Sequence, residues 1–296
     1  MATGKHDPTK AEETNVSRRD FIARSVAAGL VAATGRSFAA TLQVVESEVT
    51  VKTPDGTCDA AFIHPASGAH PGVIIWPDAA GLRPSMRDMG KRLAAGGYSV
   101  LVPNPFYRVG KAPQFTSAAN LDFKDQDLLA KIRTLMSSVQ SAGAAEKDAV
   151  AYVAFLDAQR QVDRTKKIGT QGYCMGGPLV VRTAATVPER IGAGASFHGG
   201  GLVTDKPDSP HLLAPKIKAR MYFAIAASDD QRQPDAKDKL KESFAKAGVP
   251  TEIEVYPARH GWCVPDMPVE DGAPIYDKAQ AERAWSKLVA LYKTLG

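Results

Sequence analysis

Cysteine is scarce in this sequence of 296 residues, which contains only Cys58, Cys174 and Cys263. An odd number of cysteines leaves at least one thiol free or bonded to another chain. The sequence has no C-x-x-C pair, and such pairs are typical of structural zinc sites. It therefore gives little support for a zinc site and directs attention to the chemistry of a single thiol.

Dense clusters of basic residues are also missing. The net charge is +5, but part of it lies in the first forty residues, and no later stretch is rich enough in lysine and arginine to predict a nucleic-acid groove. Internal repeats and low-complexity linkers are absent as well. The length suits one large domain with a terminal extension. We therefore expect one domain from residue 41 to 296, which is a monomer and does not bind nucleic acid.

The first forty residues carry a pattern of their own. Residues 17–40, SRRDFIARSVAAGLVAATGRSFAA, place Arg18 and Arg19 before an alanine-rich segment that ends in small residues. That segment is too short and too weakly apolar for a stable membrane span. It resembles a bacterial twin-arginine export signal. We therefore predict that residues 1–40 form a signal peptide, which the export machinery reads through Arg18 and Arg19, and that the protein is periplasmic. The alternative is an amphipathic N-terminal helix of the folded domain.

The remaining chain alternates between short apolar strands and amphipathic helices. Two strands within 41–53 and 58–65 precede repeated strand–helix units, and residues 120–159 contain two helical patterns broken near 141–143. Such alternation predicts an α/β fold with a mostly parallel, twisted sheet and helices on both faces. Further strands are expected at 71–77, 98–105, 166–174, 191–200, 219–228 and 251–257, and further helices at 84–97, 177–186, 234–248 and 278–295.

One cysteine lies between glycines directly after an apolar strand, in the stretch TQGYCMGGP at residues 170–178. Gly172 and Gly176 flank Cys174 at the spacing of a nucleophile elbow, a strained strand-to-helix turn that bulky neighbours would obstruct. The N-terminus of the following helix favours a thiolate and an oxyanion. We therefore predict that Cys174 is a nucleophile; the alternative is a buried thiol near a tight turn.

A thiol nucleophile needs a base, because few free thiols are ionised at neutral pH. The elbow architecture places an acid and then a histidine later in the chain. Asp229 and Asp230 end a predicted strand, and His260 follows the last one. We predict a triad of Cys174, Asp229 and His260, with Asp230 as the alternative acid. His198, which also ends a strand, is expected to line the pocket or to form a local hydrogen bond; the alternative is that it replaces His260.

The sequence resembles the dienelactone hydrolase family of α/β-hydrolases over nearly all of the chain after residue 40. The stretch GYCMGG is similar to the cysteine elbow of the family, and YPARHGW to its histidine block. The resemblance implies that Asp78 stands where the family has a glutamate that gates the thiol. It also implies that Arg108 binds a substrate carboxylate; the alternative is a surface or structural arginine. Val264 occupies a position where the family can have a second basic residue.

The resemblance implies hydrolysis of a small ester or lactone. Cys174 attacks the carbonyl, the backbone N–H groups of Ala79 and Met175 bind the oxyanion, and His260 then activates water. This chemistry requires no cofactor. Three alternatives stay open: another ester substrate on the same fold, a binding protein whose thiol does not turn over, and a redox role in which Cys263 approaches Cys174.

Overall fold

The computed structural model describes Met1 and residues 42–296. The predicted signal peptide, with Arg18 and Arg19, lies outside these described residues, so export and a periplasmic location stay predictions from the sequence. Within the described part of the chain, no helix combines the length and the apolar character that a membrane crossing requires.

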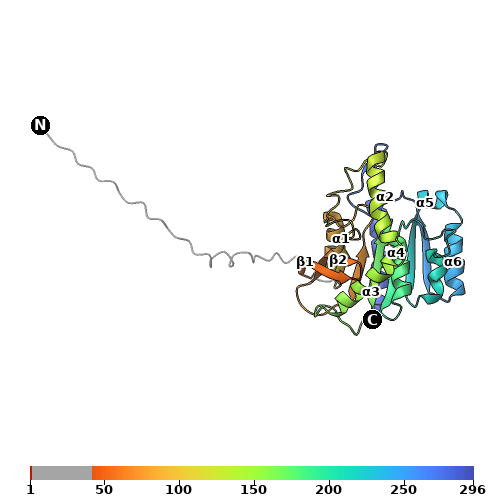
Figure 1. Cartoon of the computed structure of the whole chain (residues 1–296), viewed down its shortest axis with the longest axis horizontal. Coiled ribbons are helices and arrows are strands. Elements are labelled where there is room, and N and C mark those ends of the chain that lie inside the picture. The colour runs from red at the N-terminus through yellow and green to blue at the C-terminus, as the bar shows by residue number, and fades with distance from the viewer. Residues whose placement is uncertain (2–41) are drawn as a thin grey trace, which may run out of the picture. The chain divides into compact units, whose positions relative to one another are not determined.

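A mixed sheet of eight strands lies at the centre of residues 42–296 (Figure 1). The strand order is β1-β2-β4-β3-β5-β6-β7-β8, and β2 runs antiparallel to both of its neighbours while the other pairs are parallel. This confirms the predicted mostly parallel sheet. The strands are β1 Val44–Thr53, β2 Gly56–Pro65, β3 Gly72–Trp76, β4 Ser99–Pro103, β5 Ile168–Tyr173, β6 Ile191–Phe197, β7 Arg220–Ala226 and β8 Thr251–Tyr256.

Helices connect the strands and cover both faces of the sheet. They are α1 Pro84–Ala95, α2 Gln126–Gln140, α3 Ala144–Asp157, α4 Gly176–Thr186, α5 Ala227–Arg232, α6 Ala236–Lys246 and α7 Lys278–Tyr292, with short 3-10 helices η1 Pro210–Lys216 and η2 Lys293–Leu295. The sequence predicted every one of the longer helices, but it missed η1, the short helix α5 and a small hairpin. That hairpin is formed by β9 Val269–Glu270 and β10 Ala273–Pro274.

The sheet has a separate hydrophobic core on each face, and β3 contributes to both. Val73 and Ile75 pack with α1 and α7, whereas Ile74 and Trp76 face the core that includes residues of α3, α4 and α6. Successive side chains of a strand point to opposite faces, so a strand buried on both sides reads as a continuous apolar run. This explains the unbroken apolar sequence of β3, GVIIW.

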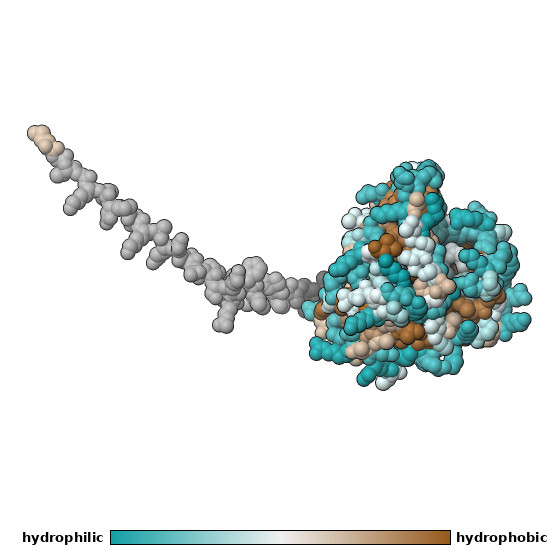
Figure 2. All heavy atoms as spheres, in the orientation of Figure 1, coloured by the Kyte–Doolittle hydropathy of each residue, from teal (hydrophilic) through white to brown (hydrophobic). Residues whose placement is uncertain are grey.

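Helix α2 stands beside α3 and reaches the upper end of the view in Figure 1. The Asp125 side chain caps its N-terminus by accepting hydrogen bonds from two backbone N–H groups. Ile132, Leu135 and Val139 form its buried stripe, while its other side faces solvent. On the face drawn in Figure 2, hydrophilic residues predominate and apolar residues form small scattered groups.

Candidate active site

The elbow is built from the end of β5, Cys174 and the start of α4. Cys174 has a φ of 52°, a backbone conformation that costs energy for a residue with a side chain. A Cβ atom on Gly172 would lie 2.2 Å from the carbonyl oxygen of Gly176, and one on Gly176 would lie 2.4 Å from that of Trp76. Both distances are too short for a real Cβ atom, so no larger residue fits at either position. The two glycines therefore allow the turn that presents Cys174 at the carboxyl end of β5.

His198 holds this turn from the neighbouring strand β6. The backbone N–H of Cys174 donates to the Phe197 carbonyl and to Nδ1 of His198, each at 3.1 Å. Burial, together with the nearby His260, lowers the pKa of His198 well below its ordinary value. His198 is therefore neutral at pH 7, and Nδ1 can accept the hydrogen bond because Nε2 carries the ring proton.

His260 and Asp229 meet at the carboxyl ends of β7 and β8. Nδ1 of His260 donates to the Asp229 carboxylate, with Oδ2 at 2.8 Å and Oδ1 at 3.0 Å. The backbone N–H of His260 donates to Oγ of Ser228 at 2.9 Å. Asp230 instead accepts from Lys237 at 2.7 Å. The structure thus places Asp229, and not Asp230, against the histidine, and Ser228 is a positioning residue that the sequence gave no signal for.

The charge state of His260 depends on its neighbours. Burial opposes protonation of the ring, but negative charge on Cys174 and the hydrogen bond to Asp229 outweigh it and raise the pKa of His260 to about 10. At neutral pH the ring is therefore an imidazolium.

The substitution Cys174→Ala is expected to lower the pKa of His260 from about 10, because the variant lacks the negative charge that stabilises the imidazolium. An NMR titration of the His260 ring would measure the change. Cys263→Ala is the matched control and should leave the titration midpoint of His260 unchanged. An unchanged midpoint in Cys174→Ala would contradict the proximity of sulfur and ring.

A cavity of about 460 Å³ opens beside these residues. Cys174, His198 and His260 line it, together with Ala79. Within the described residues, the backbone N–H groups of Ala79 and Met175 donate no hydrogen bond. Two free amides near a nucleophile are the arrangement that binds an oxyanion in acyl transfer.

Asp78 also lines the cavity, but a buried arginine holds its carboxylate. Arg83 donates to Oδ1 of Asp78 at 2.7 Å and to Oδ2 at 2.9 Å. The same guanidinium donates to both carboxylate oxygens of Asp266, each at 2.8 Å. Asp78 in turn accepts from the backbone N–H of Ala80 at 2.9 Å. This geometry does not support the expected gating of the thiol, and it indicates that Asp78 shapes the loop that carries Ala79.

Arg108, which was expected to bind a substrate carboxylate, instead pairs with carboxylates of the protein itself. Its guanidinium donates to both oxygens of Asp148 at 2.8 Å and to Asp55 at 2.9 Å. The Asp148 side chain is fully buried, so it needs this partner. Arg108 is not among the residues that line the cavity with Cys174. The geometry therefore corrects the expected role, because the charge of Arg108 already compensates two carboxylates of the protein.

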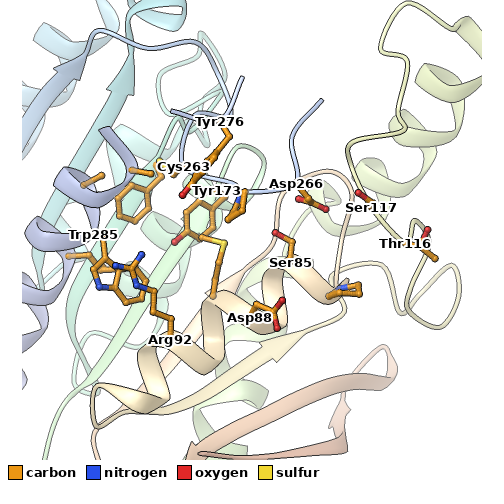
Figure 3. Close-up of a pocket in the computed structure, with 17 residues that line it drawn as sticks. Ser85, Asp88, Arg92, Thr116, Ser117, Tyr173, Cys263, Asp266, Tyr276 and Trp285 are labelled. Atoms are coloured by element: carbon orange, nitrogen blue, oxygen red, sulfur yellow. The ribbon is translucent and has the colours of Figure 1, made fainter. Parts of the chain in front are cut away.

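A second cavity, of about 530 Å³, lies between α1, α7 and the segment after His260 (Figure 3). Tyr173, Cys263 and Trp285 line it, whereas Cys174, Asp229 and His260 do not. Burial raises the pKa of the Cys263 thiol well above its ordinary value, so this thiol is unreactive at neutral pH. All three cysteines are free, and Cys263 and Cys174 line different cavities, which gives the redox alternative no support.

The sheet order, the strand-to-helix elbow and the position of the cavity beyond the carboxyl ends of the strands define an α/β-hydrolase-like fold. The sequence profile described as "Dienelactone hydrolase family" matches residues 58–296. The chain therefore belongs to the dienelactone hydrolase family.

Two relatives and two solved structures show how close the likeness is. A protein of Methylorubrum extorquens, provisionally named a carboxymethylenebutenolidase, is 27% identical over 97% of this chain and 96% of its own length. The carboxymethylenebutenolidase of Rhodococcus opacus is 28% identical over 69% of this chain and 75% of its own length. The structure titled m3DLH has a TM-score of 0.70 at 22% identity, covering 85% of this chain and 98% of that chain. A dienelactone hydrolase-like promiscuous phosphotriesterase from metagenomic libraries has a TM-score of 0.67 at 22% identity, with the same coverage of both chains.

The family and these relatives identify the chain as a hydrolase that acts on ester or lactone bonds.

Proposed function

We propose that this protein hydrolyses small esters or lactones through a thioester on Cys174. The observation that carries the proposal is the contact of His260 with Asp229 at 2.8 Å beside the cavity that contains Cys174. A carboxylate that orients an imidazole, together with an imidazole that activates a nucleophile, forms the catalytic triad that recurs on unrelated folds. The positive φ of Cys174 supports the assignment, because strain of this kind is common at nucleophile elbows.

The first half of the reaction forms the thioester. The thiolate of Cys174 attacks the carbonyl carbon, and the electron pair of the C=O bond moves onto the oxygen. The amides of Ala79 and Met175 stabilise this oxyanion. When the tetrahedral intermediate collapses, the C–O bond to the alcohol breaks, and the imidazolium of His260 gives its proton to the leaving alkoxide. His260 is then neutral.

The second half releases the acid. Neutral His260 takes a proton from water, the resulting hydroxide adds to the thioester carbonyl, and the C–S bond breaks to regenerate the thiolate. Asp229 keeps the ring oriented and stabilises the imidazolium that forms. Loss of the thiolate charge during acylation lowers the pKa of His260, because the thiolate is one of the causes of its raised pKa, and the ring therefore stays neutral until it takes a proton from water.

The thioester can be trapped and located. After rapid acid quenching during turnover of p-nitrophenyl acetate, we expect one acetyl group on the peptide that contains Cys174, detected by mass spectrometry. The Cys174→Ala variant provides the blank. Acetylation at another residue, or turnover without any acylated peptide, would refute the covalent mechanism.

A further inference from the structure

The second cavity, of about 530 Å³, is separate from the cavity that contains Cys174. Among the described residues, none lines both cavities. Tyr173 and Phe197 line the second cavity, and each directly precedes a residue that lines the first, Cys174 or His198. Tyr173 packs in the core on the α1 and α7 side of the sheet, whereas Cys174 packs against the core on the other side. The volume of the second cavity is within the range of small-molecule sites, roughly 300 to 1,000 Å³.

Aromatic rings form much of the surface of the second cavity (Figure 3). The rings of Tyr173 and Phe197 are stacked, with centroids 5.1 Å apart and an angle of 14° between their planes. Trp285 of α7 and Tyr276, which lies just before α7, add two more rings. Aromatic side chains prefer stacked or edge-to-face contacts with another ring. This surface is therefore suited to a ligand that is itself aromatic.

The indole of Trp285 is held in position by α1. The guanidinium of Arg92 lies 4.1 Å from the centroid of the Trp285 ring, and it donates to both carboxylate oxygens of Glu282. A cation over the face of an indole is attracted to it. Because a side chain that is already fixed loses little conformational freedom on binding, Trp285 is a preorganised wall for a ligand ring.

Two alanines on α7 make room for a ligand. Ala281 and Ala284 line the second cavity together with Leu288, and residues three or four apart share a face of a helix. Both alanines are buried. Their short side chains leave space between α7 and α1 that larger side chains at these positions would fill.

Tyr276 gives the second cavity a hydrogen-bond donor. Its hydroxyl forms no hydrogen bond with any residue that the structure describes. Burial raises the pKa of Tyr276, so the hydroxyl keeps its proton at neutral pH and can donate it. An oxygen of a ligand in the cavity could accept this hydrogen bond.

From these observations we propose that the second cavity is a binding site for a small aromatic molecule that carries a hydrogen-bond-accepting oxygen, as an aryl ketone does. The ring contacts Trp285 and the stacked rings of Tyr173 and Phe197, and the oxygen accepts from Tyr276. The inference goes beyond the hydrolase function and does not depend on it, because Cys174 and the other proposed catalytic residues do not line this cavity.

Binding of 4′-fluoroacetophenone to the unmodified protein tests the proposal. The broadening of its ¹⁹F NMR line during a titration should show saturable binding. We expect the same affinity after treatment with iodoacetamide, which alkylates Cys174, because Cys58 and Cys263 are buried and Cys174 is the thiol that is partly exposed. The absence of saturable binding, or its loss on alkylation, would overturn the assignment to the second cavity.

Variants of α7 locate the bound probe. Ala284→Phe places a ring in the second cavity and should abolish binding, whereas Ala279→Phe changes an exposed position of the same helix outside the cavity and should leave the affinity unchanged. A thermal melt checks that Ala284→Phe is folded. Trp285→Ala is the second test, and it should weaken binding by about three- to tenfold, because it removes a ring-to-ring contact. Unchanged affinity in a folded Ala284→Phe variant or in Trp285→Ala would contradict the proposed site.

A matched pair of ketones tests the ligand class. Acetophenone and cyclohexyl methyl ketone share the carbonyl oxygen and differ in having an aromatic or a saturated ring. Acetophenone should displace the fluorinated probe at a several-fold lower concentration. Tyr276→Phe should weaken the binding of acetophenone several-fold, since it removes the donor. Equal displacement by the two ketones would refute the preference for an aromatic ring, and unchanged affinity in Tyr276→Phe would refute the hydrogen bond.

Discussion

Cys174→Ala is expected to lower kcat/KM for a p-nitrophenyl ester by a factor on the order of 10³ or more, with the folded structure retained. Removing the nucleophile of a triad eliminates the covalent route, and only the contribution of binding and oxyanion stabilisation remains. Cys174 is only partly buried, so the loss of one sulfur atom should change the free energy of unfolding little. Steady-state kinetics and a thermal melt would measure the two effects separately.

Cys263→Ala is the control for this experiment. Cys263 is three residues from His260 in sequence, but it lines the second cavity (Figure 3). Its replacement should leave kcat/KM within about twofold, because the change removes no group from the cavity with Cys174. A loss comparable to that of Cys174→Ala would show that the thiol chemistry has been assigned to the wrong cysteine.

Arg83→Met is expected to lower the free energy of unfolding by about 3–5 kcal/mol, since breaking a buried ion pair from one side leaves an uncompensated charge. Arg83 is completely buried and holds the buried Asp78 and the partly buried Asp266 together. Methionine keeps most of the side-chain length, so the loss reflects the missing charge more than a missing volume. Urea denaturation would measure it.

Arg87→Met, one turn further along α1, is the matched control. Arg87 pairs with Glu46 and Glu48 at a more exposed position, where an ion pair contributes only about 0–1 kcal/mol. If both variants lost the same free energy, the Asp78–Arg83–Asp266 cluster would not be the structural element that we infer. Arg83→Met should also reduce activity beyond its effect on folding, because Asp78 bonds to the loop that carries the Ala79 amide.

The partners of Arg108 lie within the protein itself. Asp148 places a buried carboxylate against Arg108 from α3, and Asp55 adds a second one from the turn between β1 and β2. The guanidinium has five N–H donors, and most of them are directed at these two carboxylates and the Ala144 carbonyl. The substrate specificity of this chain is therefore expected to depend on the wall of the cavity and not on this arginine.

The sequence alone determined the fold class and the order along the chain of the candidate nucleophile, acid and histidine. The continuous apolar run of β3 and the glycines around Cys174 are local signals, because they report the burial of one strand and the steric limits of one turn. The sequence also placed His260 and an aspartate at the ends of the last two strands of the parallel sheet, since parallel strands end at a common edge.

Only the tertiary structure decided which groups touch. Asp229 and Asp230 are adjacent in sequence, and the short helix α5 turns the first toward His260 and the second toward Lys237. The partners of Asp78 and Arg108 lie on other elements, at Arg83 and Asp148. Packing between segments that are distant in the chain decides which way a side chain points and which charged group it contacts. Local sequence patterns carry no information about such contacts. Here these contacts removed Arg108 from the expected substrate site and paired Asp78 with Arg83.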